Sequence, residues 1–326
     1  MEMVKHKFKV SEFINRRLPW IILVLLICIF SIFSPNFLSI SNLTNILNQN
    51  SYVLVASYGI ALVMMSGQMD LSVGYQMSII GVVSAMLMTN YSVPTGLIVL
   101  IAMALGILMS LMNTYLAMKL KLKLMMVSIA AMNIFQGFSY TFTESKTYLG
   151  FPESFKFLGQ GSVGPVPFAI ILALVLFIVM SFFLNKTYLG RYVYALGGNE
   201  EASRLAGINV TGVKLMIAAL EGLFVGLATV MLISRIGSAQ SAIGPGTEFT
   251  VITGVLLGGV SVRGGEGRLS GVAGGILIMA VLSNGMQMVG LGTYAQYMMK
   301  GAIMLLAIGI DIFQMNRKAK VKKAKA

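Results

Sequence analysis

Four ionisable residues lie in or beside long apolar runs: Asp70, Glu221, Lys300 and Asp311. Charged groups in such runs are costly, so they usually face protein or water. Asp70 sits in a Gly/Ser break, where its carboxylate can accept hydrogen bonds from the first backbone N–H groups of the next helix. We expect that structural role rather than ion binding. Glu221 and Lys300 either pair or line a polar path, and Asp311 is expected to be solvated.

Groups for catalysis and metal binding are scarce. The one histidine, His6, lies in a basic arm, and the one cysteine, Cys28, lies in an apolar run. These residues give no intramembrane Ser/His/Asp triad, no ordinary metal site and no internal disulfide. The sequence also has no G-x-x-x-x-G-K-[ST] phosphate loop. We therefore predict that the chain is not an enzyme and binds no metal or cofactor, so any ATP and Mg²⁺ are used by a partner ATPase.

The polar segment 197–207 is predicted to form a short helix capped at both ends. Asn199 is a good N-cap, two glutamates in the first turn favour the helix dipole, and Gly207 can adopt the left-handed conformation that ends a helix. Two alanines four residues apart give a small-residue face that suits a groove of a soluble partner; the alternative is a solvated loop helix. The residues of this predicted docking segment are Gly197, Gly198, Asn199, Glu200, Ala202, Ala206 and Gly207.

The elements around these residues are predicted to be membrane helices. The chain of 326 residues is 57% hydrophobic and only 11% charged, whereas soluble domains carry roughly 25% charged residues. Apolar runs of near-spanning length recur throughout, so we expect an all-α polytopic bundle of about ten spans. A separate amphipathic surface helix is expected within residues 34–50. The expected spans are residues 20–33, 51–65, 75–90, 94–118, 124–142, 167–184, 213–233, 249–260, 269–288 and 294–312.

The positive charge is concentrated in a few segments. Of the 24 lysine and arginine residues behind the net charge of +13, 20 lie at the two ends or in three turns between apolar runs. Basic flanks mark the cytoplasmic side of a membrane protein, so the charge indicates topology rather than nucleic-acid binding. Both termini are therefore expected to be cytoplasmic. The predicted parts are a basic arm (1–19), a transmembrane domain (20–312) with a cytoplasmic loop (185–212), and a basic tail (313–326).

Two hairpins, residues 52–90 and 249–288, resemble each other weakly. Each consists of an apolar run, a Gly/Ser-rich break and a second apolar run. Gly-interrupted segments in corresponding places commonly mark a transport path. The residues assigned on this basis to broken helices along a path are Asp70, Ser72, Gly74, Gly258, Gly259, Gly264 and Gly265.

Four stretches together resemble the ribose-type ABC permease family. The polar loop reads LGRYVYALGGNE over 189–200 and AGIN over 206–209, similar to the cytoplasmic loop of those permeases. The others read NFLSISNL (36–43), DLSVG (70–74) and VLLGGVS followed by GGEGR (255–268). Their order and spacing match the family along essentially the whole chain. Gln68 and residues 123–130 depart from the family pattern at positions that can line a path, and therefore the identity of the particular substrate is not carried over from the family.

The resemblance implies a permease subunit of an ABC importer in the cell membrane, one that translocates a monosaccharide. It implies three partners: a second permease subunit, identical or different, a cytoplasmic ABC ATPase and an extracytoplasmic substrate-binding protein. Two alternatives stay open. One is a permease for a nucleoside or a sugar-like signal, and the other is a gradient-driven transporter that uses Asp70, Glu221 and Lys300.

Overall fold

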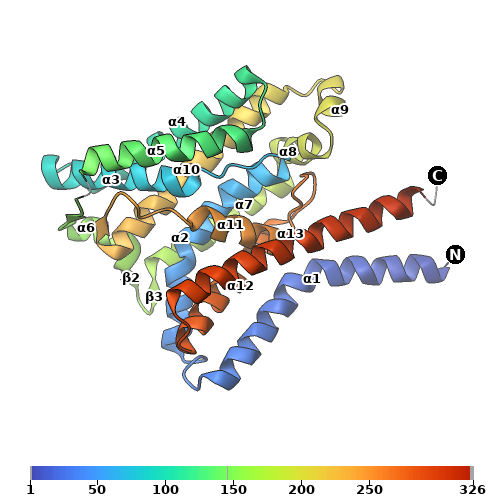
Figure 1. The fold of residues 1–326 in the computed structure, drawn as a ribbon, viewed down its shortest axis with the longest axis horizontal. Coiled ribbons are helices and arrows are strands. Elements are labelled where there is room, and N and C mark those ends of the chain that lie inside the picture. Colours follow the sequence, from blue (N-terminus) through green and yellow to red (C-terminus); the bar gives the residue numbers. More distant parts are fainter. Residues whose placement is uncertain (1, 145, 324–326) are drawn as a thin grey trace.

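The structure, a computed structural model, describes residues 2–144 and 146–323, and the side chains of residues 17–144 and 146–313. It is a bundle of helices with two small two-stranded sheets in its loops (Figure 1). The helices are α1 (Glu2–Phe33), α2 (Ile40–Met65), α3 (Val73–Tyr91), α4 (Thr95–Leu120), α5 (Leu124–Thr143), α6 (Glu153–Gln160), α7 (Phe168–Lys186), α8 (Tyr188–Gly198), α9 (Glu200–Leu205), α10 (Val210–Ile236), α11 (Thr247–Leu257), α12 (Leu269–Met288) and α13 (Thr293–Lys323). The strands are β1 (Tyr148–Leu149), β2 (Ser162–Val163), β3 (Val166–Pro167) and β4 (Ser238–Ala239).

Each predicted span coincides with one helix: α1, α2, α3, α4, α5, α7, α10, α11, α12 and α13. Among the described residues, five helices are long and apolar enough to cross a membrane by length and composition. These are α4, α7, α10, α12 and the part of α13 over Thr293–Phe313, whereas α1 over Arg17–Phe33 and α11 are apolar but shorter. The chain is therefore an all-α membrane protein, and the count of ten crossings stays a prediction.

The start of α2 differs from the prediction. A separate surface helix within residues 34–50 does not form, because α2 runs unbroken through this region. The polar residues at its middle bond back to their own helix: the Asn50 amide donates to the Ile46 carbonyl at 2.8 Å, and the Ser51 hydroxyl donates to the Leu47 carbonyl at 2.8 Å. With these groups satisfied and no glycine or proline between Ile40 and Ser51, nothing interrupts the helix in this region.

The polar loop 143–166 is more ordered than the sequence indicates. It contains α6, which packs on α10: the Gly159 N–H donates to the Ser234 hydroxyl at 2.8 Å, and that hydroxyl donates to the Phe155 carbonyl at 2.7 Å. β1 pairs with β4 in antiparallel register, and β2 pairs with β3 as a hairpin. The loop therefore covers one end of α10.

α10 is the central helix, with its most extensive packing against α4 and α2. Glycines let these helices approach closely, since small residues allow two backbones to touch. Gly106 of α4 lies against the backbone of Gly222, and Gly59 of α2 lies against the backbone of Glu221. Tyr58 ties α2 to α7 through a hydrogen bond of 2.9 Å from its hydroxyl to the Ala173 carbonyl.

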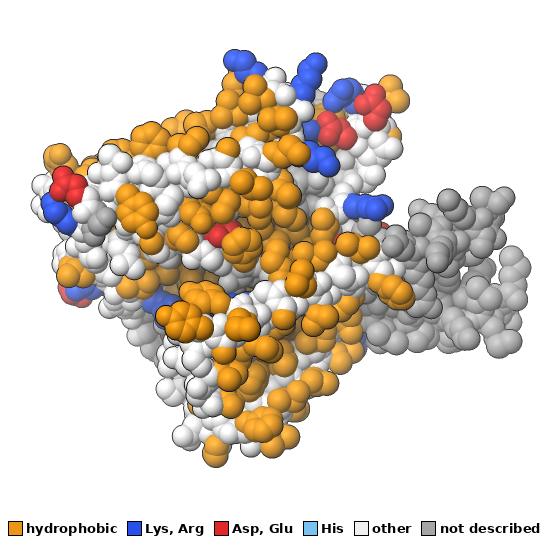
Figure 2. All heavy atoms as spheres, in the orientation of Figure 1, with side chains coloured by type: hydrophobic (Ala, Val, Ile, Leu, Met, Phe, Trp, Pro, Cys, Tyr) orange, Lys and Arg blue, Asp and Glu red, His pale blue; other side chains and the backbone are white. Residues whose placement is uncertain are grey.

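The two ends of the chain lie on the same side of the bundle, and α8 and α9 lie toward that side (Figure 1). The α6 helix and the β2–β3 hairpin lie toward the opposite side. Figure 2 shows hydrophobic side chains spread widely over the same view, while basic and acidic side chains gather around α9 and, in smaller number, at the opposite edge. The polar loop and both chain ends thus share one side of the molecule.

Candidate functional site

The predicted capped helix is present as α9. The Asn199 side chain accepts a hydrogen bond from the Ala202 N–H at 2.9 Å, which confirms the predicted N-cap. Gly207 has a φ of +82°, the left-handed conformation expected of the residue that ends the helix. Ala206 follows the last helical residue, and the Leu205 side chain before it is 82% exposed. The tip of the loop therefore offers an uncovered apolar side chain on a rigid turn.

Five glycines bring three distant segments together at the base of α9. Gly197 lies directly against the Met65 carbonyl at the end of α2 and against the Gly265 N–H. The Gly265 N–H donates to the Met65 carbonyl at 2.8 Å, and Gly264 lies against Gly67. We call these five residues the glycine junction: Gly67, Gly197, Gly198, Gly264 and Gly265.

The glycine junction depends on the absence of side chains. A Cβ on Gly197 would collide with backbone atoms of both other segments, whereas a Cβ on Gly198 would meet no atom within 4 Å. Gly67, Gly264 and Gly265 have φ values of +81°, +82° and +75°, a region that favours glycine. The docking segment and the late glycine turn, predicted as separate features, thus belong to one contact.

Tyr194 of α8 strengthens the same contact. Its hydroxyl donates to the Gly267 carbonyl at 3.1 Å. Burial raises the pKa of the Tyr194 hydroxyl, and the nearby Arg268 only partly offsets that effect. The hydroxyl therefore stays protonated and available as a donor.

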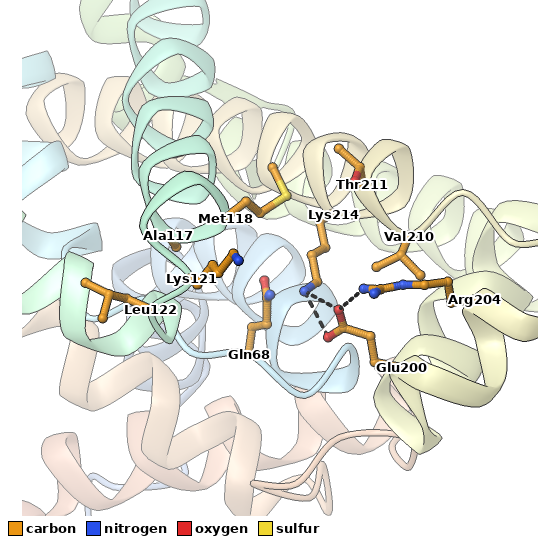
Figure 3. Close-up of a pocket in the computed structure, with 10 residues that line it drawn as sticks. All are labelled: Gln68, Ala117, Met118, Lys121, Leu122, Glu200, Arg204, Val210, Thr211 and Lys214. Atoms are coloured by element: carbon orange, nitrogen blue, oxygen red, sulfur yellow. Dashed lines mark hydrogen bonds and ion pairs between the residues drawn. The ribbon is translucent and has the colours of Figure 1, made fainter.

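Glu200 ties α9 to the start of α10. Both of its carboxylate oxygens accept from the Lys214 ammonium at 2.9 Å, and one also accepts from the Arg204 guanidinium at 3.3 Å. These side chains border a cavity of about 430 Å³ together with Lys121 and Gln68 (Figure 3). The sequence assigned Glu200 to the helix dipole and the docking segment but missed its pairing with Lys214, because the two residues lie in different helices whose relative placement the sequence does not give.

Asp70 anchors the turn that leads into α3. One carboxylate oxygen accepts from the Ser72 N–H at 2.7 Å and from the Ser72 hydroxyl at 2.6 Å. The Asn113 amide donates to the other oxygen at 3.3 Å and to the Ser72 hydroxyl at 2.9 Å. Asp70 and Ser72 are both buried, as is Asn113. The expected structural role of Asp70 agrees with these contacts.

Further buried polar residues extend this network to neighbouring helices. The Gln76 amide donates to the Ser72 hydroxyl at 2.9 Å and accepts from the Ser110 hydroxyl of α4 at 3.2 Å. The Ser128 hydroxyl of α5 accepts from the Leu71 N–H at 3.1 Å. Sequence reasoning missed these partners and Asn113, for which the only signal was a polar residue within an apolar run.

Gly74 and Gly258, two of the other predicted path residues, pack against backbone atoms of a neighbouring segment. Gly74, at the start of α3, lies against the Gly244 backbone and the Glu248 carboxylate. Gly258, at the end of α11, lies against Gly271 of α12. Gly259 follows with a φ of +82° and open space beside it, so it serves the turn rather than a close contact.

The remaining ionisable residues lie apart from one another. Glu221 is buried and does not pair with Lys300; within the described residues neither of its carboxylate oxygens has a hydrogen-bond partner. Asp311 is partly exposed, and beyond the predicted solvent contact its carboxylate accepts from the Val262 N–H at 3.1 Å and the Ser261 hydroxyl at 3.3 Å. Asp311 thereby fastens α13 to the late glycine turn. The described residues contain no group of three or more His, Cys, Asp or Glu side chains arranged to hold a metal ion.

Comparison with known proteins gives a consistent relationship. Residues 42–308 match the family described as branched-chain amino acid transport system / permease component. The ribose import permease protein RbsC of Escherichia coli (strain K12) is 36% identical over 295 residues, covering 89% of this chain and 92% of that protein. No solved structure matches the chain significantly.

Two further relatives from the same strain have similar coverage. The galactose/methyl galactoside import permease protein MglC is 32% identical over 92% of this chain and 94% of that protein. The L-arabinose transport system permease protein AraH is 34% identical over 89% of this chain and 88% of that protein. With the family match spanning α2 to α13, the chain belongs to the branched-chain amino acid transport system / permease component family.

Proposed function

We propose that the chain is the membrane-spanning permease subunit of an ATP-binding-cassette importer that carries a monosaccharide across the cytoplasmic membrane. Its sugar-import relatives support the substrate class. The observation that carries the proposal is the glycine junction, because it connects the exposed helix α9 to both interrupted hairpins. An input at α9 therefore has a direct mechanical route into the bundle.

The proposal includes a topology and three partners. The side that holds α9 and both chain ends is cytoplasmic, in agreement with the concentration of basic residues in those segments. A cytoplasmic ATPase docks on α9 and uses ATP and Mg²⁺. A second permease subunit, identical or different, completes the path, and an extracytoplasmic binding protein delivers the substrate.

Coupling follows from the contacts of α9. Closure of the ATPase halves moves α9, and Gly197 transmits that movement to the end of α2 and to the turn at Gly264 and Gly265. The Glu200–Lys214 ion pair carries the same movement into α10. ATP drives transport only if the docked ATPase binds one arrangement of these segments more tightly than the other.

Asp70 and Ser72 act in this proposal as supports rather than as substrate ligands. Their polar atoms are engaged with each other and with Asn113 and Gln76 inside the bundle. The network therefore holds α3 at a fixed angle after the break.

A mild-detergent pull-down of the tagged chain, with mass spectrometry of the co-purifying proteins, tests the proposal. A stoichiometric partner with phosphate-loop motifs is the expected result. Recovery of the chain alone, repeated after cross-linking, contradicts the proposal and favours the gradient-driven transporter. Ala206→Trp provides a second test, since the exposed Ala206 position is predicted to lose transport while the chain still inserts into the membrane.

A further inference from the structure

Two interrupted helices, α3 and α11, begin against each other in the interior of the fold. The backbone of Gly74, the second residue of α3, lies against the backbone of Gly244, just before α11. The Gly244 N–H also donates to the Ser78 hydroxyl of α3 at 3.2 Å. The first turns of interrupted helices are used in membrane transporters to bind polar ligands, because their N–H groups and dipoles point inward.

α5 forms the neighbouring wall, lying alongside α3 (Figure 1). The Gln136 amide and the Ser139 hydroxyl both donate to the Ser241 carbonyl, at 3.1 and 3.0 Å. These two bonds hold α5 against the connection that leads into α11. Three segments that are distant in sequence thus meet around this point.

Two tyrosines and a carboxylate come from the segments that meet here. Tyr75 of α3 follows Gly74, which lies against the Glu248 carboxylate, and Tyr140 of α5 follows Ser139, whose hydroxyl donates to the Ser241 carbonyl. The Glu248 carboxylate accepts two bonds of 3.0 Å from the Gly246 N–H, so it is held in place. Within the described residues no hydrogen bond is made by the Tyr75 or Tyr140 hydroxyl, and Tyr140 is 45% exposed.

A narrow line of small and polar residues runs along the outward face of α5, between exposed apolar side chains such as Ile134 and Phe138. Ala130, Asn133, Gly137 and Thr141 recur at helical spacing in the middle of that face, and all are exposed. The Asn133 amide bonds only to the Ile129 carbonyl of its own helix, at 3.3 Å. Small and polar residues in a membrane helix face protein or water rather than hydrocarbon. This line of α5 therefore suits contact with protein or water.

We propose that Tyr75, Gln136, Tyr140 and Glu248 form a contact site for a neutral, polyhydroxylated substrate on the translocation path. A carboxylate accepts hydrogen bonds, an amide donates and accepts, and a phenol does both, which matches the alternating donors and acceptors of adjacent sugar hydroxyls. The aromatic rings supply apolar faces for the sugar ring. The inference rests on the proposed function and adds the residues that meet the substrate.

Cysteine accessibility in the assembled importer tests this site. The lone cysteine, exposed Cys28, is first replaced by Cys28→Ser. Gln136→Cys and Tyr140→Cys are then compared with Phe182→Cys, an exposed apolar position on α7. A water-soluble thiol reagent is added to both membrane faces, and labelling is measured with and without ribose, galactose or arabinose during ATP-driven uptake.

We expect the two site cysteines to react at least about tenfold faster than Phe182→Cys, because a thiol in an apolar environment rarely ionises. The transported sugar is expected to slow that labelling at both site positions. Labelling no faster than at Phe182→Cys contradicts an aqueous path here, and labelling that the sugar does not slow contradicts substrate contact.

The Cys28→Ser parent separates this inference from the proposed function. If the parent complex takes up none of the three sugars, the proposed substrate class fails before any site variant is labelled. If the parent transports a sugar, Gln136→Leu and Tyr140→Leu are expected to raise the KM of uptake, whereas Phe138→Leu, on the apolar flank of α5, leaves it unchanged. Unchanged uptake in all three variants overturns the assignment of the site.

Discussion

The glycine junction predicts opposite outcomes for two adjacent substitutions. A methyl group at Gly197 would collide with the Met65 carbonyl and the Gly265 N–H, which are backbone atoms that cannot rotate away. A methyl group at Gly198 would meet no atom within 4 Å. Gly197→Ala therefore forces the three segments apart, and Gly198→Ala is the matched control.

The size of the effect follows from the lost contacts. Overpacking costs about 1–3 kcal/mol, and loss of the 2.8 Å hydrogen bond between Gly265 and Met65 costs about 1 kcal/mol. Replacing a helical glycine by alanine returns about 0.5–1 kcal/mol. A net loss of about 2 kcal/mol would lower the ratio of joined to separated junctions roughly 30-fold.

The assay is transport per ATP hydrolysed by the importer in proteoliposomes. We expect Gly197→Ala to assemble with its ATPase and hydrolyse ATP while taking up far less sugar per ATP than the parent. Gly198→Ala is expected to match the parent in both measurements. Parental uptake per ATP in Gly197→Ala would refute the claim that the junction carries the movement of α9.

Three further predictions concern the supports of the site. Lys214→Glu and Glu200→Lys are each expected to lower uptake and to destabilise the loop by about 1 kcal/mol or less. The double variant should restore both uptake and loop stability. A double variant no better than the single variants contradicts the ion-pair link. Tyr194→Phe removes the bond to the Gly267 carbonyl, a loss of about 1 kcal/mol that should lower uptake per ATP. Because burial raises the pKa of Tyr194, its hydroxyl keeps its proton, and uptake per ATP by the parent should stay level between about pH 7 and 9. Asp70→Ala leaves buried donors of Ser72 and Asn113 unpaired and should cost about 2–4 kcal/mol of stability, seen as a lower Tm. Asp70→Asn keeps an acceptor and should lower Tm less. Equal Tm values for the two variants would contradict the structural role of Asp70.

The helices were predictable because the signals for them are local. Long apolar runs indicate helices without reference to the rest of the chain, and each predicted span coincides with one. The cap of α9 is local too, since Asn199 and Ala202 lie three residues apart. Where polar side chains satisfied themselves within a helix, as Asn50 and Ser51 do, the sequence suggested a break that does not exist.

Contacts between distant segments could not be predicted in the same way. Gly197, Gly264 and Gly265 were recognisable as unusual, but no local pattern connects them to Met65. Asp311 was assigned to solvent because its partner, the Val262 N–H, lies 49 residues away. The pairing of Glu200 with Lys214 was missed for the same reason.

The glycine junction also has a consequence for biosynthesis. Its three segments leave the ribosome in the order Met65–Gly67, then Gly197 and Gly198, and last Gly264 and Gly265. α9 is therefore synthesised long before the turn that supports it. A nascent chain that stops ahead of that turn carries α9 without its support, so the surface proposed here to dock an ATPase is complete only on a subunit whose synthesis is nearly finished.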